Sequence, residues 1–278
     1  MLMPQSLREA CAFCAEQTAI PMAGATDLLV HWPIRPEAQD KTYLDLSAIS
    51  ELRPFRWTDV SLHIGALTTY WDILRDPQTR AEFPLLHEAA RQVGAIQIQS
   101  RGTWAGNIAN GSPAADGVPV LLAYDASVVL TSMAGSREIP LREYYTGYRN
   151  SVRRSDELIT SIILPRRRYD FSVFHKVGAR RAQAITKVGI AVTREAGARA
   201  ANPWRVVASS VAATVRRCPA IEAFLASGAL VRVPSDFFAS IDADIRPIDD
   251  IRSTASYRRT VLARLLYHSL RGVSATVV

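Results

Sequence analysis

Apolar residues near the start of the chain recur at helical spacing and then change to a strand pattern. Residues 6–18 place Leu7, Cys11 and Cys14 on one face of a predicted helix. The segment 20–22 is strand-like and leads into a turn of small residues. The pattern therefore predicts a helix-to-strand step at the N-terminus.

Short strand-like segments follow, and they are interrupted by helical ones. Alternating or clustered apolar residues predict strands over 42–46, 53–57 and 61–64. Thr68 or Thr69 is placed to cap a helix that runs to Leu74, and a longer helix is predicted over 84–93, ended by Gly94. This part of the chain is therefore predicted to mix helices and strands.

The second half repeats this mixture in a different order. A Gly- and Asn-rich stretch over 102–111, interpreted as a loop, precedes a helix-like apolar run over 118–123. Further strands are predicted over 127–131, 157–164, 171–177, 186–193 and 205–215, and helices over 219–226 and 253–271. Pro165 and the three arginines after it form a natural boundary. Strands followed by helices predict an α+β C-terminal unit of about 100 residues.

Composition limits the class of protein. The 278 residues, 48% hydrophobic and 21% charged, suit a globular chain of one large domain or two ordinary ones. The 33 basic residues exceed the 26 acidic ones and give a net charge of +7, but they are dispersed, so no nucleic-acid role is expected. No apolar run is long enough to span a membrane and no export signal is visible, so a cytoplasmic protein is expected.

Cysteine and histidine patterns argue against several kinds of site. The three cysteines are too few for a secreted disulfide framework. Cys11 and Cys14 form a C-x-x-C pair, which can be a redox or metal motif, but they are better interpreted as buried residues of one helix. The five histidines are scattered without a hydrolase or metalloprotease arrangement. We therefore expect neither a catalytic residue nor a metal ligand on this chain.

Residues 22–28 form the first candidate binding segment. Small side chains let backbone N–H groups approach a ligand, and several such groups in a row make a concave anion site. Thr26 would add a hydroxyl. A plain strand-to-helix turn capped by Thr26 or Asp27 explains the same residues.

Residues 101–116 form the second candidate segment. It contains three glycines, two asparagines, Thr103, Ser112 and Asp116. Backbone donors, short hydroxyls and one carboxylate suit a phosphate and a ribose or ribityl chain, although a structural loop remains the alternative. The chain contains neither G-x-G-x-x-G after a strand nor G-x-x-x-x-G-K-[ST], which argues against a Rossmann domain and a P-loop NTPase.

These segments resemble a known family. Residues 23–28 resemble its AGGTDL turn, and 103–116 resemble its TIGGN-I-x-x-x-S-P-x-x-D segment. Further similarity covers 64–69, 84–90, 98–102, 157–165, 176–182 and 250–258, in the family's order. The family comprises the flavoprotein (medium) subunits of molybdenum hydroxylases, such as xanthine dehydrogenase and carbon monoxide dehydrogenase.

The resemblance implies an α+β fold with two domains. Residues 1–165 would form a PCMH-type (vanillyl-alcohol-oxidase-type) FAD-binding domain with subdomains of about 1–52 and 53–165, and 166–278 a C-terminal domain of the CO dehydrogenase flavoprotein type. FAD would lie extended between the subdomains. The implied cofactor-binding residues are Met22, Ala23, Gly24, Ala25, Thr26, Asp27, Leu28, Thr103, Gly106, Asn107, Ala109, Asn110, Ser112, Asp116, Leu158, Ile159 and Lys176.

The resemblance also assigns roles within this set. The first segment would cradle the pyrophosphate, and the second would hold pyrophosphate, ribityl and adenosine. Leu158 or Ile159 would pack near the flavin ring or adenine. Lys176 would lie near the flavin, where its charge would stabilise a reduced, anionic ring, although a surface lysine on a strand is equally compatible with the sequence.

Two departures from the family pattern affect the glycines. Ala25 and Ala105 each replace one glycine of a pair. An alanine held at positive φ would be strained by about 1 kcal/mol. Trp104 is bulkier than the family's usual aliphatic residue and is expected to pack against either the flavin or a subdomain interface.

The function implied is electron transfer within a larger enzyme. FAD would receive electrons from 2Fe-2S clusters on a small subunit and pass them to NAD, oxygen or a quinone, while a large subunit would carry the molybdopterin. A heterotrimer, or a dimer of heterotrimers, would follow. Two alternatives remain: a self-sufficient FAD oxidoreductase of the same fold, and a flavin-free scaffold subunit.

Overall fold

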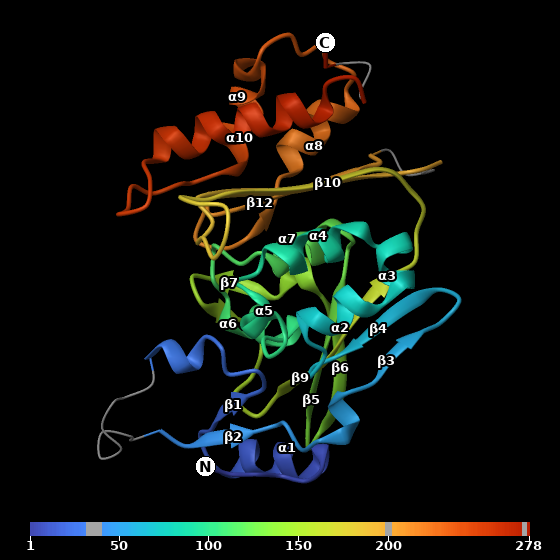
Figure 1. Cartoon of the computed structure of the whole chain (residues 1–278), viewed down its shortest axis with the longest axis vertical. Coiled ribbons are helices and arrows are strands. Elements are labelled where there is room, and N and C mark those ends of the chain that lie inside the picture. Colours follow the sequence, from blue (N-terminus) through green and yellow to red (C-terminus); the bar gives the residue numbers. More distant parts are fainter. Residues whose placement is uncertain (32–40, 198–201, 274–276) are drawn as a thin grey trace.

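The elements are stacked along one long axis. The computed structural model describes residues 1–31, 41–197, 202–273 and 277–278. Figure 1 shows the N-terminal helix and a small sheet at one end, a larger sheet and a group of helices in the middle, and the C-terminal sheet with its helices at the other end. Helices and strands occur in both halves, so the predicted α+β class is confirmed.

The N-terminal elements follow the prediction closely. Helix α1 (Leu7–Glu16) is capped by Ser6, whose hydroxyl accepts the Glu9 N–H at 3.2 Å. Strand β1 (Ile20–Met22) pairs in parallel with β2 (Tyr43–Asp45). Cys11 and Cys14 are buried in the contact between α1 and strand β5, and burial raises the pKa of both thiols, as expected for inert core cysteines.

A five-stranded antiparallel sheet forms the centre of the first core. Its strand order is β3-β4-β9-β5-β6, with β3 Phe55–Trp57, β4 Ser61–Gly65, β9 Leu158–Pro165, β5 Ser127–Ser132 and β6 Gly135–Pro140. Strand β6 was not predicted. Its sequence is polar and only partly buried, and it is a strand because it pairs with β5 along its whole length at the edge of the sheet.

The helical layer lies beside this sheet. It contains α2 (Tyr70–Arg75), α3 (Pro77–Glu82), α4 (Pro84–Gln92), α5 (Ile96–Gln99), α6 (Trp104–Asn110) and α7 (Gly117–Ala123). Thr69, one of the two predicted caps, forms a capping box with Asp72. The short helices α3 and α5 were not predicted. Short 3-10 turns occur at Leu28–His31, Ser50–Leu52 and Leu141–Glu143, and a hairpin joins β7 (Tyr145–Gly147) to β8 (Asn150–Ser151).

The prediction of a loop over 102–111 is wrong, because most of this segment is helix α6. The Thr103 hydroxyl caps this helix by accepting the Gly106 N–H at 2.9 Å, and Gly111 ends it at φ +62°. Trp104 and Ile108 are fully buried on one side of the helix. Burial of these two side chains therefore outweighs the low helix propensity of Gly and Asn.

The C-terminal sheet is antiparallel with the order β10-β11-β12-β13. Its strands are β10 (Tyr169–Val177), β11 (Val188–Glu195), β12 (Trp204–Ser209) and β13 (Arg216–Arg217). The single strand predicted over 205–215 is too long, because β12 ends where Ser210 takes φ +61° and turns the chain. One face carries α8 (Pro219–Ala226), the 3-10 turn Pro234–Phe237, α9 (Phe238–Asp244) and α10 (Ala255–Leu270); the other packs on α4 and α7.

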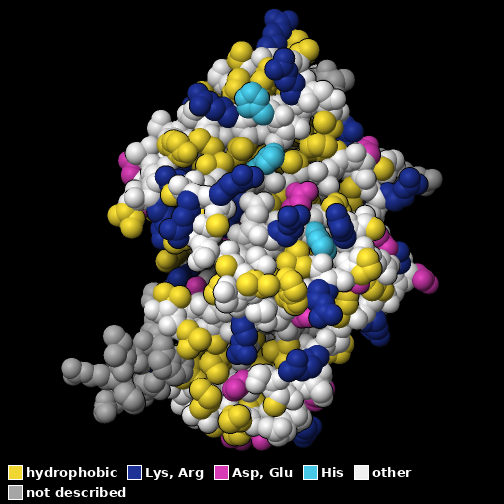
Figure 2. Space-filling model, in the orientation of Figure 1, with side chains coloured by type: hydrophobic (Ala, Val, Ile, Leu, Met, Phe, Trp, Pro, Cys, Tyr) yellow, Lys and Arg dark blue, Asp and Glu magenta, His cyan; other side chains and the backbone are white. Residues whose placement is uncertain are grey.

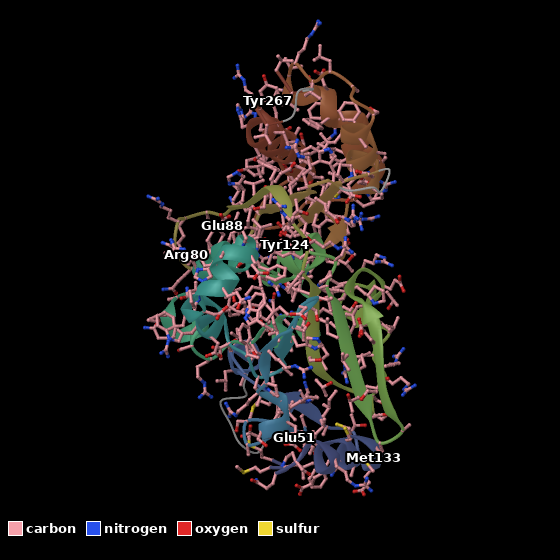
Figure 3. All side chains as sticks on the ribbon, turned by 90° about the vertical axis from the view of Figure 1, so that its right-hand side faces the viewer. Glu51, Arg80, Glu88, Tyr124, Met133 and Tyr267 are labelled. Carbon is pink, nitrogen blue, oxygen red and sulfur yellow. The ribbon has the colours of Figure 1, made fainter. Side chains whose placement is uncertain are left out.

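Two groups of buried hydrophobic residues correspond to the two sheets. One surrounds the five-stranded sheet and the helical layer, and the other lies between the C-terminal sheet and its helices. Figure 3 shows Tyr124 where the helical layer meets the C-terminal sheet and Tyr267 among the C-terminal helices. The Tyr124 hydroxyl accepts the Leu85 N–H at 3.1 Å, which ties α4 to the end of α7.

A partly buried aspartate links the helical layer to the C-terminal sheet. Asp125 follows α7 at φ +51°. Its carboxylate lies 2.9 Å from the Arg205 guanidinium and 3.1 Å from those of Arg167 and Arg217. These ion pairs join residues far apart in sequence, and two of them connect this end of α7 to strands β12 and β13.

The surface agrees with the dispersed basic charge. On the face in Figure 2, Lys and Arg side chains are spread over the height of the molecule and do not form one continuous patch. In the described parts of the chain, no helix has both the length and the apolarity needed to cross a membrane.

Candidate functional site

A cavity of about 480 Å³ lies between the turn after β1 and helix α6. Strand β9 contributes a further wall. Thirteen of the seventeen residues implied by the family resemblance line this cavity: Ala23, Gly24, Ala25, Thr26, Asp27, Leu28, Thr103, Gly106, Asn107, Ala109, Asn110, Leu158 and Ile159. The fold therefore brings three distant segments together around one space.

The turn over 23–28 approaches the backbone before α6 very closely. A Cβ atom on Gly24 would lie 1.9 Å from the Arg101 carbonyl oxygen, so only glycine fits there. Ala25 takes φ +59°, and the strain expected for an alanine at positive φ is found at this residue. Ala105 lies inside α6 instead, so the same expectation is wrong for that position.

This turn presents free donors. Among the described residues, the backbone N–H groups of 24–27 and the Thr26 hydroxyl have no protein partner. Residues 24–26 are half-buried, so their N–H groups without a protein partner need an acceptor from elsewhere, whereas Asp27 is exposed to water. Several neighbouring N–H groups that face one cavity suit an anion with several oxygens, such as a diphosphate.

Helix α6 forms the opposite wall. A Cβ on Gly106 would lie 2.8 Å from the Thr103 hydroxyl, so glycine keeps the helix cap intact. The side-chain Oδ1 of Asn107 accepts a hydrogen bond from the Gly117 N–H at 3.1 Å, which fixes this side chain against the start of α7. The Asn110 amide has no partner in the described structure and is available to a ligand. This wall therefore offers short polar groups held by a capped helix.

The remaining walls are largely apolar. Leu158 and Ile159 are buried and line the cavity beside Tyr70. Burial raises the pKa of Tyr70 well above its usual range, with a further contribution from the Asp116 charge, so Tyr70 stays neutral. Trp104 does not line the cavity; it is fully buried with its ring centre 4.9 Å from that of Tyr70. The bulky residue of the second segment thus packs in the core and supports a cavity wall.

Four residues of the implied set lie outside the cavity lining. Met22 ends β1, and its carbonyl accepts the Leu46 N–H at 2.9 Å. The Ser112 hydroxyl accepts the Ala114 N–H at 3.2 Å. Asp116 and Lys176 form an ion pair at 2.6 Å. Burial raises the pKa of the Asp116 carboxyl, and the Lys176 charge opposes this effect.

Two arginines that sequence reasoning did not select line the same cavity. Arg149 and Arg153 come from the hairpin of β7 and β8 and the segment after it. Arg149 takes φ +52° and packs against Gly111, and within the described residues its guanidinium is not in an ion pair. Because neither residue lies in a recognisable motif, only the fold reveals their position. They add positive charge to a cavity already suited to an anion.

Comparison with protein families matches both halves of the chain. Residues 1–167 match the family described as the FAD binding domain in molybdopterin dehydrogenase. Residues 173–273 match the CO dehydrogenase flavoprotein C-terminal domain. The two matches together cover almost the whole chain.

Curated relatives and solved structures agree. The chain is similar to the nicotinate dehydrogenase FAD-subunit of Eubacterium barkeri, at 34% identity over 67% of this chain and 65% of that protein. It is similar to the carbon monoxide dehydrogenase medium chain of Hydrogenophaga pseudoflava, at 27% identity over 98% of this chain and 96% of that one. A structure of carbon monoxide dehydrogenase from the same organism, lacking the Mo-pyranopterin moiety, superposes with a TM-score of 0.83 and 26% identity, covering 97% of this chain and 94% of that chain.

Proposed function

Because the chain belongs to the family of FAD-binding domains in molybdopterin dehydrogenases, we propose that it transfers electrons between a partner subunit and an acceptor. It is an oxidoreductase component and an FAD-binding medium subunit of the molybdenum hydroxylase family. The observation that carries the proposal is the single cavity that joins the unpaired N–H groups of 24–27 to helix α6.

The residues present fit FAD. The N–H groups of 24–27 would hold the diphosphate, and Gly24 lets this turn lie close enough to the α6 side to share the cavity. Thr103, Asn107 and Asn110 would orient hydroxyl groups of the ribityl or ribose parts. Arg149 and Arg153 would offset the negative charge of the phosphates.

The apolar wall would serve the ring systems. Leu158 and Ile159 are buried and line one side of the cavity, where they would offer an apolar contact to a ring. When bound, FAD supplies a ring that takes up and releases electrons, which no side chain here does. This chain's residues would bind, orient and shield the cofactor, and none would act as an acid, base or nucleophile.

The wider assembly is also part of the proposal. Relatives named as medium chains or FAD-subunits support partners: a 2Fe-2S small subunit that delivers electrons and a large subunit that carries molybdopterin. We propose a cytoplasmic heterotrimer or dimer of heterotrimers, with NAD, oxygen or a quinone as acceptor. The proposed division is an FAD-binding domain over 1–165, with subdomains of about 1–52 and 53–165, and a C-terminal domain over 166–278.

The two alternative functions make different predictions. A self-sufficient FAD oxidoreductase would be active without partner subunits. A flavin-free scaffold requires that the altered glycine pairs prevent binding, but Ala105 lies at an ordinary helical position and Ala25 adds only one methyl group at the turn. The geometry therefore favours a flavin-binding subunit over a scaffold.

The test is the chromophore of the purified chain. We expect flavin absorption bands, and free FAD after denaturation and chromatography. Iron and molybdenum should appear only when the chain is purified together with its partners. A colourless protein that also fails to take up added FAD would contradict the proposal, and turnover by the isolated chain would support the self-sufficient alternative.

A further inference from the structure

A second cavity lies where the end of α7 meets the C-terminal sheet. Its volume is about 460 Å³, which is a usual size for a small-molecule site. Its walls come from the end of α7, from residues 141–145, and from residues 214–222, which include β13 and the start of α8. Tyr124, labelled in Figure 3, follows α7 at this end. The described residues that line this second cavity all differ from those around the proposed FAD site, here called the flavin cavity.

Two arginines from opposite halves of the chain line the second cavity with their charge available. In the part of the chain that the structure describes, the Arg216 guanidinium has neither an ion pair nor a hydrogen bond. The Arg142 guanidinium contacts Glu143 at 3.0 Å, but these two side chains are 51% and 60% exposed, so water weakens their attraction. Both guanidinium groups can therefore bind an anion in the cavity.

The acidic residue of the lining is already neutralised. Glu222 is buried, and its two carboxylate oxygens accept hydrogen bonds from Arg217 at 2.7 and 2.9 Å. Arg217 also lies 3.1 Å from the Asp125 carboxylate, so its own charge is fully engaged. The uncompensated charge in the cavity is therefore positive, and it comes from Arg142 and Arg216.

Uncharged hydrogen-bond donors lie next to Arg216 in the chain. Val215 lines the cavity and is 4% exposed, and its backbone N–H finds no acceptor within the described residues. The hydroxyl of Thr214, a half-buried lining residue, likewise has no partner in that part of the chain. A buried N–H group without a protein partner needs an acceptor from elsewhere. These donors and the two guanidinium groups together suit an anion with several oxygens.

The rest of the lining is largely apolar. Leu122 and Leu141 are buried and line the cavity together with Val215. Tyr145 adds an aromatic ring, which is held in place because its hydroxyl donates to the Ile108 carbonyl at 2.9 Å. An inorganic anion alone would leave these apolar side chains without a contact, so the lining fits an anion that carries an organic group.

We propose that the second cavity binds a small organic phosphate monoester, such as a nucleoside monophosphate. The phosphate would lie between Arg142 and Arg216, and the organic group would contact Leu122 and Leu141. A phosphate monoester carries up to two negative charges and three terminal oxygens, which match two guanidinium groups and two further donors better than a carboxylate does. This site is separate from electron transfer and does not depend on FAD binding.

The experiment is calorimetric titration of the full chain saturated with FAD, so that the flavin cavity is occupied. The probes are AMP, inorganic phosphate and adenosine, which separate the contribution of the phosphate from that of the organic group. We expect AMP to bind at least about tenfold more tightly than either of the other two, because only AMP uses both the charged and the apolar parts of the lining.

Three arginine variants locate the site. Arg142→Gln and Arg216→Gln should each weaken AMP binding by about tenfold, the usual effect of losing one charge-assisted hydrogen bond. Arg264→Gln is the matched control, since Arg264 is an exposed residue of α10 that lines neither cavity. It removes the same charge and should bind AMP as the wild type does.

Each other result overturns the proposal. No binding of AMP at millimolar concentrations excludes the site, and equal losses in all three variants reduce it to general attraction between charges. Phosphate that binds as tightly as AMP removes the role of the apolar lining. If the wild type takes up no FAD, the FAD-free chain is titrated with Arg149→Gln added, and weaker AMP binding in that variant alone assigns AMP to the flavin cavity.

Discussion

Ala25 and Ala105 show how much the backbone decides at the scale of single residues. Both residues stand where the flavoprotein family has a glycine, and nothing in the sequence indicates that their backbone conformations differ. Ala25 has φ +59° in the cavity turn, whereas Ala105 lies in the first turn of α6. The strain could be predicted as a possibility from sequence, but its location depends on dihedral angles that only the fold determines.

The two alanines should respond oppositely to glycine. Ala25→Gly removes left-handed strain and should stabilise the protein by up to about 1 kcal/mol. Ala105→Gly adds backbone freedom to a helix and should destabilise it by about 1 kcal/mol. Urea unfolding of both variants measures the two free energies, and a loss of stability in Ala25→Gly would show that the turn is not strained.

Asp125 could not have been selected from sequence, because its three arginine partners lie 42 to 92 positions away. Its side chain is 13% exposed, so these ion pairs are only weakly screened by solvent. Asp125→Asn keeps the shape but leaves the Arg205 guanidinium without its carboxylate partner and takes one of two carboxylates from Arg167 and Arg217, and it should destabilise the protein by about 2 kcal/mol.

Thermal or urea unfolding measures this loss. Asp170→Asn is the matched control, since Asp170 is paired with Arg194 but is 47% exposed, and its change should cost about 0.5 kcal/mol or less. Equal costs for the two variants would contradict the importance of the Asp125 cluster.

At the scale of elements, helix α6 marks the limit of sequence-based prediction. Long periodic segments such as 84–93 and 219–226 were predicted correctly, because their own patterns determine helices. Residues 102–111 were interpreted as a loop from their Gly and Asn content, yet Trp104 and Ile108 bury one side and make a helix. Strand β6 was missed for the converse reason: its pairing partner β5 determines it, and its own sequence does not.

The cap of α6 can be tested against another cap. Thr103→Ala removes the acceptor for the Gly106 N–H and should cost about 1 kcal/mol, and it should also raise the FAD dissociation constant because this wall lines the cavity. Ser6→Ala removes the equivalent cap of α1, which does not line the cavity, and should cost a similar amount.

Unfolding and FAD titration are needed together for these two variants. We expect equal losses of stability and weaker FAD binding in Thr103→Ala alone. If Ser6→Ala weakens FAD binding as much, the effect of Thr103 is a consequence of lower stability and not of the cavity wall.

At the scale of the whole molecule, the site is created by topology. The segments over 22–28 and 101–116 could be recognised from sequence because small residues gather in them. Arg149 and Arg153 could not, since nothing in a surface hairpin indicates that it closes the same cavity. The contact between Thr186 and Asp116 is likewise invisible in sequence, because their separation carries no pattern.

Acid stability should depend on a buried carboxylate beside the cavity. Hydrogen bonds and charge from Arg137, with help from the Arg154 N–H and charge, lower the pKa of Glu157, which is 1% exposed. A carboxyl group whose pKa is lower in the folded than in the unfolded state stabilises the fold at pH values above its unfolded-state pKa. This contribution is lost as the pH falls through the folded-state pKa. Stability should therefore fall as the pH drops below the ordinary carboxyl value of 4.5.

Urea unfolding from pH 7 to pH 3 measures this dependence. Glu157→Gln should be less stable than wild type at pH 7, and the difference should shrink toward pH 3. A constant difference between the two proteins across this range would mean that Glu157 does not titrate with folding.

The FAD dissociation constant of Gly24→Ala tests most directly whether the cavity between residues 23–28 and α6 binds flavin. Gly24 has no room for a Cβ, because the Arg101 carbonyl oxygen would lie 1.9 Å away, so alanine must push the donor turn off the α6 side of the cavity. Gly147→Ala is the control, since its nearest neighbour to a Cβ is 3.9 Å away. When circular dichroism shows that both variants are folded, FAD binding should be at least about tenfold weaker for Gly24→Ala alone. Wild-type affinity in Gly24→Ala would contradict this prediction.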